Sequence, residues 1–212
     1  MKRFIVSGTW GRAPACDYAA DGPLLVFAHG AGAAQSHPFM TSHAEALSAR
    51  GVRVVTFDFP YMAEARRAPD RPAVLEACFE AVLAAALTHA RVASAVIGGK
   101  SMGGRIASLL AARETKGMAG LVVLGYPLKP PSGTLRVSHL GALRVPALFV
   151  QGERDSFGGP SDLAPYLPAT ARVLAIDGAE HSFAVRKKDG RSAQDIATQI
   201  DDAVAAFVRA CV

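Results

Sequence analysis

Short apolar runs alternate along the chain with longer segments of helical periodicity. Each run carries hydrophobic residues at consecutive positions, which predicts strands buried on both faces of a sheet. The runs cover residues 24–28, 52–57, 95–97, 121–124, 147–150 and 173–176. A further strand is possible at 3–7, whereas the Gly-, Pro- and Asp-containing stretch from residue 8 to 23 gives no firm assignment.

Helices are expected between these strands. One covers 38–50 and stops at Gly51, and a longer one follows Asp70, which we take as its N-cap, with Pro72 in the first turn. The apolar face of this longer helix comprises Leu75, Cys78, Val82, Leu83, Ala86 and Leu87. Cys78 is therefore interpreted as a packing residue.

Two more helices are expected in the second half of the chain. One follows residue 101 and buries Ile106, Leu109 and Leu110. The last opens with a capping-box pattern, Ser192 to Asp195. Its apolar stripe comprises Ile196, Ile200, Val204, Phe207 and Val208.

Strands alternating with helices predict an α/β fold with a mostly parallel central sheet and helices on both faces. At 212 residues and 22.1 kDa, the chain is expected to form one domain over residues 1–212. Ligands of such sheets bind beyond the C-terminal ends of the strands. Candidate functional residues are therefore sought there.

Composition and charge exclude several classes of protein. Half of the residues are hydrophobic, 19% are charged, and the net charge is +5. The basic residues are dispersed without interleaved aromatics, so we expect no nucleic-acid partner. Only Phe4, Ile5 and Val6 follow Lys2 and Arg3 as an apolar run, so no signal peptide is expected. We also expect no membrane span, because no apolar stretch is taken to reach membrane-spanning length. The three cysteines, Cys16, Cys78 and Cys211, are widely spaced, which favours a reduced cytoplasmic location and neither a metal site nor a disulfide framework.

Residues 94–104 contain the pattern of a nucleophile elbow. An apolar run ends in glycines, Ser101 follows, and an apolar helix begins at once. A serine on such a sharp strand-to-helix turn needs small residues on both sides, and Gly99 and Gly103 stand two positions before and after it. Ser101 is the candidate nucleophile.

Two phosphate-binding motifs resemble parts of the sequence without matching them. Gly-Gly-Lys-Ser at 98–101 lacks the P-loop glycine, because Ser94 occupies that position. Gly30 and Gly32, with Asp58 after the next strand, resemble a dinucleotide fingerprint, but Gln35 stands where a third small residue belongs. We therefore expect no cofactor.

A serine nucleophile needs a base and an acid, and α/β hydrolases supply them in the order Ser, Asp or Glu, His. Of the histidines after Ser101, only His181 lies beyond the last expected strand. Asp155 follows the strand at 147–150 and is the candidate acid, with Glu153 as a near rival. Weaker rivals in the histidine's own loop are Asp177 and Glu180.

The oxyanion of a tetrahedral intermediate needs two N–H donors. The first helical residue after the nucleophile, Met102, supplies one. The glycine-rich loop after the strand at 24–28 supplies the second, which we assign to Ala31. His29 is interpreted as a residue that holds this loop.

Several segments together resemble the serine α/β-hydrolases of the dienelactone-hydrolase-like clan, and among these the small bacterial hydrolases similar to testis-expressed protein thirty. The segments that carry the resemblance are His29–Gly32, His37–Met40, Phe57–Met62, Arg66–Pro69, Gly98–Gly104, Gly125–Leu128, Gln151–Asp155 and His181–Phe183. The resemblance implies the α/β-hydrolase fold and a triad of Ser101, Asp155 and His181. Dienelactone hydrolases themselves use a cysteine nucleophile, so Ser101 argues against that particular activity.

The short connection between the strands at 121–124 and 147–150 leaves no room for a large lid. We therefore expect an open site for a small-molecule acyl substrate with a short acyl group, bordered by His37, Tyr61 and Tyr126, although both tyrosines could equally be packing residues. The leading hypothesis is hydrolysis of a small carboxylic ester through an acyl-enzyme. A non-catalytic scaffold and an acyltransferase remain as alternatives. The charge of Lys100, beside Ser101, has no role that the sequence explains.

Overall fold

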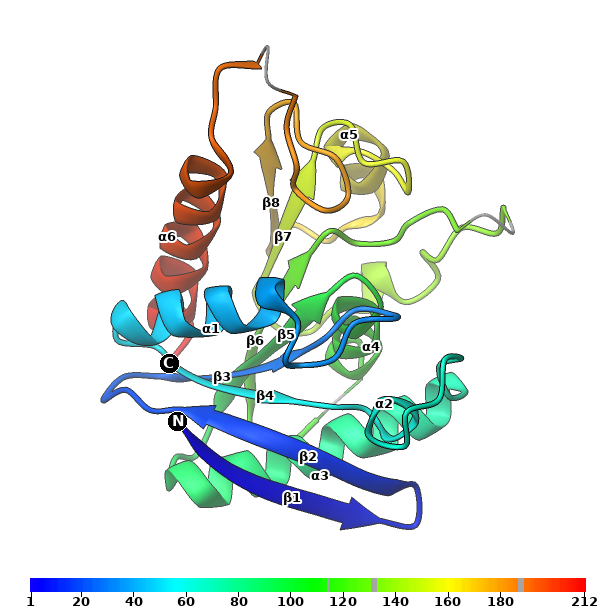
Figure 1. The fold of residues 1–212 in the computed structure, drawn as a ribbon. Helices are drawn as coiled ribbons and strands as arrows, with labels where there is room; N and C mark the ends of the chain where they lie inside the picture. The colour runs from blue at the N-terminus through cyan, green and yellow to red at the C-terminus, as the bar shows by residue number, and fades with distance from the viewer. Residues whose placement is uncertain (114, 131–132, 187–188) are drawn as a thin grey trace.

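The computed structural model describes residues 1–113, 115–130, 133–186 and 189–212, and its centre is one eight-stranded sheet (Figure 1). The strand order is β1-β2-β4-β3-β5-β6-β7-β8. From β4 to β8 all neighbouring strands are parallel, whereas β1 and β2 are antiparallel to each other and β2 is antiparallel to β4. The strands are β1 (Lys2–Gly8), β2 (Gly11–Tyr18), β3 (Leu24–Ala28), β4 (Arg53–Phe57), β5 (Ala95–Lys100), β6 (Met118–Leu124), β7 (Ala147–Gly152) and β8 (Ala171–Ile176).

Helices cover both faces of the sheet, as expected from the sequence. Buried residues of α1 and α6 join one hydrophobic cluster, and those of α3 and α4 join a second cluster on the opposite face (Figure 1). The α-helices are α1 (Pro38–Ala49), α2 (Pro60–Ala63), α3 (Pro72–Ala90), α4 (Met102–Ala111), α5 (Pro160–Leu163) and α6 (Ala193–Cys211). Short 3₁₀ segments within the described residues include η1 (Leu140–Ala142) and η2 (Ala164–Tyr166). In the described part of the connection between β6 and β7, η1 is the one helical element, so the expected minimal form without a large lid is confirmed.

The N-terminal hairpin contains the strand that the sequence left unassigned. In β2, Ala13 and Ala15 face the core while Arg12 is exposed. The alternation is hard to recognise because the inward residues are small, Pro14 lies between them, and the buried Asp17 is paired with an arginine. Small side chains and a proline give a weak strand pattern even where the pairing is regular.

The start of α3 differs from the prediction. The N-cap is Arg71 and makes no side-chain capping bond. The carboxylate of Asp70 instead accepts hydrogen bonds from Tyr61 N (3.0 Å) and from Arg66 (2.7 Å). The prediction that Asp70 caps α3 was therefore wrong, because that carboxylate holds the preceding turn.

Helix α3 is also long and apolar enough to cross a membrane by length and composition, with a mean hydropathy of 1.5. The expectation that no segment reaches this length was wrong on that count. Six of its residues, Leu75, Cys78, Phe79, Val82, Leu83 and Ala86, are buried against the sheet and α4. A core helix of this kind meets the same criterion as a membrane span.

The final helix agrees closely with its pattern. Ser192 Oγ accepts from Asp195 N at 3.1 Å, and the Asp195 carboxylate accepts from Ser192 N at 2.9 Å, so the predicted capping box is confirmed. The expected apolar stripe of α6 is buried in full.

Candidate active site

The turn at Ser101 joins β5 directly to α4. Ser101 adopts a left-handed φ of 50°, an uncommon conformation for a residue with a side chain, and it is the N-cap position of α4. Its N–H donates to Leu124 O at 2.9 Å, which fixes the turn to the neighbouring strand β6. A strained backbone held in this way lifts the serine hydroxyl clear of the sheet.

Glycines on both sides of Ser101 are required by close backbone contacts. A Cβ atom built on Gly99 would lie 2.6 Å from Ala28 O, and one on Gly103 would lie 2.5 Å from His29 O. Both distances are too short for any side chain. The glycines therefore allow the elbow to pack against the end of β3, as the sequence pattern indicated.

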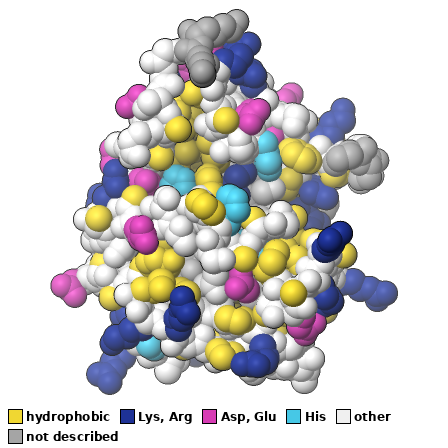
Figure 2. Space-filling model, in the orientation of Figure 1, with side chains coloured by type: hydrophobic (Ala, Val, Ile, Leu, Met, Phe, Trp, Pro, Cys, Tyr) yellow, Lys and Arg dark blue, Asp and Glu magenta, His cyan; other side chains and the backbone are white. Residues whose placement is uncertain are grey.

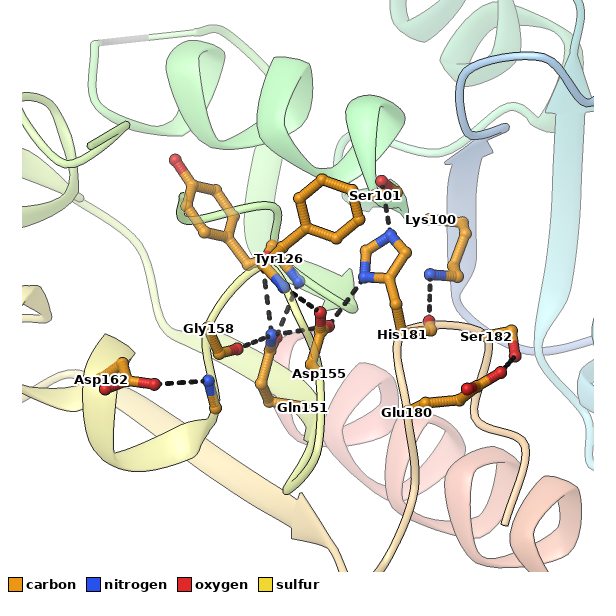
Figure 3. A network of polar contacts seen from close by, with 12 residues as sticks. Lys100, Ser101, Tyr126, Gln151, Asp155, Gly158, Asp162, Glu180, His181 and Ser182 are labelled. Carbon is orange, nitrogen blue, oxygen red and sulfur yellow. Dashed lines mark hydrogen bonds and ion pairs between the residues drawn. The ribbon is translucent and has the colours of Figure 1, made fainter. Parts of the chain in front are cut away.

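The structure brings Ser101, His181 and Asp155 together from three separate strand ends (Figure 3). His181 Nε2 lies 2.9 Å from Ser101 Oγ, and His181 Nδ1 lies 2.7 Å from Asp155 Oδ2. Since a carboxylate only accepts, Nδ1 carries the proton and Nε2 of the neutral ring is free to accept from the serine. This is the geometry that activation of a serine hydroxyl needs.

Asp155 is buried and its carboxylate is held by donors from its own segment. Oδ1 accepts from Phe157 N at 2.8 Å, and Oδ2 accepts from Gln151 Nε2 at 3.0 Å. The Phe157 ring also lies against the His181 ring, with centroids 4.6 Å apart. Neither Gln151 nor Phe157 was singled out from the sequence.

Gln151 is fully buried at the end of β7 and connects Asp155 to the segment that follows β6. Its Oε1 accepts from Tyr126 N at 2.7 Å, while Nε2 also donates to Gly158 O at 2.7 Å. A buried amide at the end of an otherwise apolar strand needs partners, and that was the sequence signal that could have identified it.

The rival candidates for acid and base lie in other contacts. Glu153 accepts from Gly178 N, and Glu180 accepts from Ser182 Oγ. Asp177 is exposed. His139 is bonded to Ser108 Oγ, at 2.8 Å, instead of to Ser101.

The loop after β3 is held by two buried side chains. His29 Nε2 accepts from Phe59 N at 3.1 Å, so the opposite nitrogen, Nδ1, carries the proton and donates to Gly30 O at 2.8 Å. Burial lowers the pKa of His29, in agreement with a neutral ring. Gln35 then joins the loop to Asp58 through its backbone N–H, at 2.7 Å, and its side chain. His29 thus holds the loop, as the sequence suggested.

Both expected oxyanion donors are available. Ala31 N–H donates to no protein acceptor within the described residues. Met102 is the first residue of α4, where the N–H has no acceptor within the helix. The Met102 side chain packs half-buried against the core.

A cavity of about 360 Å³ opens beside the serine–histidine pair. It is lined by Gly30, Ala31, Ala33, His37, Phe39, Met40, Lys100, Ser101, Phe157, His181 and Ser182. A larger hollow of about 710 Å³ lies over β1 and β2, and it includes none of the three candidate catalytic residues. The smaller cavity is therefore the candidate substrate site.

A family model described as an alpha/beta hydrolase domain matches residues 21–209. The chain belongs to the alpha/beta hydrolase family. The resemblance inferred from the motifs is confirmed at this level, and family membership supports hydrolase activity. No functionally curated protein shows significant sequence similarity to this hydrolase.

Solved structures share the fold along nearly the whole length of the hydrolase. An alpha-beta serine hydrolase homologue from Coxiella burnetii has a TM-score of 0.77 at 18% identity, covering 98% of this chain and 97% of that one. An α/β serine hydrolase without lid from Xanthomonas campestris has a TM-score of 0.75 at 17% identity, covering 98% and 94%. A dienelactone hydrolase from Anabaena variabilis has a TM-score of 0.73 at 19% identity, covering 97% and 95%. At these identities the likeness concerns the fold.

Of the three residues expected to border the substrate, the hydrolase places one at the cavity. His37 lines it and also caps α1, where Nδ1 accepts from Phe39 N at 3.2 Å. Tyr61 is fully buried, with its ring 5.9 Å from that of His29. Tyr126 is also buried, its ring packs edge-on against Phe149, and its hydroxyl donates to Arg136 O. Neither tyrosine is among the described residues that line the cavity, so both are placed as packing aromatics.

Figure 2 shows basic side chains scattered over one face instead of gathered in a patch. Within the described ranges, no three His, Cys, Asp or Glu side chains lie together in a metal-binding arrangement.

Proposed function

We propose that the protein is a serine hydrolase that cleaves small carboxylic esters through an acyl-enzyme. The observation that carries this proposal is the continuous hydrogen-bonded series from Asp155 through His181 to Ser101, at 2.7 and 2.9 Å, beside an open cavity. Family membership and the esterase fold of its structural neighbours support the same conclusion.

Catalysis begins when His181 Nε2 takes the proton of Ser101 Oγ and the oxygen attacks the ester carbonyl. The imidazolium stays paired with the Asp155 carboxylate and then gives its proton to the leaving alcohol. Water gives a proton to the same imidazole and attacks the acyl-serine. The imidazolium then returns that proton to Ser101 Oγ as the acyl C–O bond breaks, which releases the carboxylic acid and free Ser101. In both halves the negative oxygen is held by the N–H groups of Ala31 and Met102, each worth on the order of a hundredfold in turnover or more.

The cavity supports short acyl groups as substrates. About 360 Å³ is at the lower end of the range for small-molecule sites, and its walls include the apolar side chains of Phe39, Met40 and Phe157. We expect acetate and butyrate esters to be turned over better than long-chain esters. Faster turnover of long-chain esters would contradict this part of the proposal.

The test compares Ser101→Ala with Ser108→Ala. Ser108 is the matched control because its hydroxyl is also bonded to a histidine, at 2.8 Å, but it is fully buried. We expect Ser101→Ala to abolish hydrolysis of a p-nitrophenyl acetate-type ester and labelling by a fluorophosphonate, while Ser108→Ala retains both.

Other outcomes separate the alternatives. If the wild-type protein showed no esterase activity and did not react with the fluorophosphonate, a non-catalytic scaffold with the hydrolase fold would be favoured. Labelling at Ser101 combined with product formation only when an alcohol or amine acceptor is added would favour acyl transfer. Retained activity in Ser101→Ala would contradict the proposed nucleophile.

A further inference from the structure

Lys100 connects two segments whose spacing must be kept for the proposed chemistry. It is the last residue of β5 and directly precedes Ser101. Its Nζ donates to the backbone carbonyl of His181 at 2.7 Å (Figure 3). One side chain thus joins the backbone that carries the serine to the backbone that carries the histidine.

The loop around His181 has few other attachments to β5. Within the described residues, Lys100 Nζ is the one donor recorded for the His181 carbonyl. Phe183 adopts a left-handed φ of 67° and closes a turn in which its N–H donates to Glu180 O at 2.9 Å. This turn is local to the loop, so it does not fix the distance between His181 and Ser101.

The surroundings of the lysine are shaped to hold an amine. Nζ lies 5.3 Å from the centroid of the Phe183 ring and 5.9 Å from that of Phe39, distances typical of cation–π contacts. A Cβ atom on Gly125 would lie 2.8 Å from Nζ and 3.4 Å from His181 Cε1. Glycine at 125 therefore leaves the space in which the amine and the imidazole both lie.

We propose that Lys100 is a positioning residue: it ties the nucleophile elbow to the His181 loop and keeps the imidazole between Asp155 and Ser101. The proposal extends the proposed function, because positioning matters to catalysis only if His181 is the base. A misplacement of reacting groups by about 1 Å can lower a rate by about a hundredfold.

The charge of Lys100 gives the proposal an effect on pH dependence. The titratable groups around it are Asp155 after β7, His181 after β8 and His37 at the start of α1, while the sides formed by Phe39 and Phe183 are uncharged. Burial lowers the pKa of Lys100 to about 8, and the charge of Asp155 opposes this shift. A lysine that is still protonated at pH 7 disfavours a second positive charge on the nearby imidazole.

The principal variant is Lys100→Met, which keeps most of the side-chain volume but removes the donor and the charge. We expect kcat for a small ester to fall by about tenfold to a hundredfold, with KM changed by less than about threefold. The acidic limb of the kcat/KM profile should move to higher pH, since the imidazolium no longer faces a cation. Lys2→Met, at an exposed position of β1, is the control for loss of a surface charge.

Lys100→Arg keeps both donor and charge. It should recover a substantial part of kcat and keep the wild-type acidic limb. If Lys100→Met kept the wild-type kcat and the wild-type acidic limb of the pH profile, the proposal would be overturned. The proposal would also be overturned if Lys100→Met lost kcat with no shift of the acidic limb and Lys100→Arg recovered none of it, since that pattern indicates a role in packing alone.

Hydrogen exchange of residues 179–185 gives a readout that needs no activity. The amides of Glu180 and Phe183 are hydrogen-bonded within the loop, and Lys100→Met should make them exchange faster while the remaining sheet is unchanged. If the wild-type protein neither hydrolyses esters nor reacts with a fluorophosphonate, the proposed function fails. The exchange comparison still decides whether Lys100 holds the loop: equal exchange in wild type and Lys100→Met would overturn the proposal.

If Lys100→Met does not fold, Lys100→Gln takes its place, because glutamine keeps a donor without the charge. We expect residues 179–185 of Lys100→Gln to exchange as in the wild type, while the acidic limb of the pH profile moves to higher pH. An unmoved acidic limb would overturn the proposal.

Discussion

Two serine–histidine hydrogen bonds of nearly equal length lie along helix α4. Ser101 Oγ is 2.9 Å from His181 Nε2 at the start of the helix, and Ser108 Oγ is 2.8 Å from His139 Nε2 near its end. The distance alone does not distinguish them. What differs is the direction of the proton and the space around the serine.

Which atom donates the proton in each serine–histidine hydrogen bond follows from the other hydrogen-bond partners of the serine and the histidine. The Ser108 hydroxyl has one proton, which it donates to Arg105 O at 2.7 Å, so His139 Nε2 must be the donor to Ser108. An imidazole that donates to a serine cannot take its proton. At Ser101 the order is reversed, because His181 donates from Nδ1 to Asp155 and accepts at Nε2.

The space around the two serines also differs. Ser108 is fully buried, whereas Ser101 lines the cavity of about 360 Å³. Burial, together with the nearby Arg105 cation, lowers the pKa of His139 to about 4. Of these two contacts, only the one at Ser101 has a carboxylate behind the ring and a cavity beside the serine, the arrangement that serine hydrolysis needs.

Substituting the two histidines tests this comparison most severely. We expect His181→Ala to lower kcat/KM for a small ester by roughly a thousandfold or more, because Ser101 loses its proposed base. His139→Ala should keep the activity to within a few-fold and change only stability. Steady-state kinetics of the two variants measure the difference, and comparable losses would contradict the distinction between the pairs.

Replacing the acid tests the direction of the proton. Asp155→Asn puts an amide next to His181 Nδ1, which can hold the ring with its proton on Nε2, the wrong nitrogen for accepting from Ser101. We expect a loss of kcat on the order of a thousandfold. Glu153→Gln is the control, because Glu153 bonds to Gly178 N and does not reach the histidine. An active Asp155→Asn variant would mean that another group orients the ring.

The sequence predicted those parts of the molecule that have strong local patterns. The apolar strands, the capping box at Ser192 and the elbow at Ser101 all depend on residues close together in the chain. The strand β2 and the cap of α3 were not predicted correctly, because Pro14 obscures an alternation and Asp70 bonds back to Tyr61 instead of capping. Local propensity cannot reveal such tertiary preferences.

The same limit applies to the candidate site. Chain order was enough to nominate Ser101, Asp155 and His181, since each follows a different parallel strand. The contact of Lys100 with the His181 carbonyl joins residues far apart in the chain, and no local pattern announces it. The roles of Tyr61 and Tyr126 were ambiguous because a position after a strand does not show whether a ring faces a cavity or the core.

Gln151 provides a test of intermediate size. Gln151→Met removes one donor to Asp155 Oδ2 and leaves Tyr126 N without its side-chain acceptor. We expect a loss of about tenfold in kcat and a loss of stability on the order of 1–3 kcal/mol, as is usual when a buried polar group loses its partner. Kinetics and urea denaturation measure the two effects. Gln194→Met, at an exposed position of α6, is the control, and equal behaviour of both variants would show that Asp155 is held by its other donor alone.

The smallest expected effect concerns the pH dependence of stability at His139. Its pKa is about 4 in the folded protein against an ordinary value of 6.5, because burial and Arg105 disfavour the charged ring. Between these values the unfolded chain binds more protons, so the free energy of unfolding contributed by His139 is fully present above pH 6.5 and is lost as the pH falls toward 4. For a partly exposed side chain we expect a loss of about 1 kcal/mol. Urea denaturation at pH 7 and pH 4.5 should therefore show a smaller acid destabilisation in His139→Gln than in the wild type. An equal loss in both proteins would mean that the ring at Ser108 is charged at low pH in the folded state, and the contrast between the two serine–histidine pairs would then rest on the cavity and the carboxylate alone.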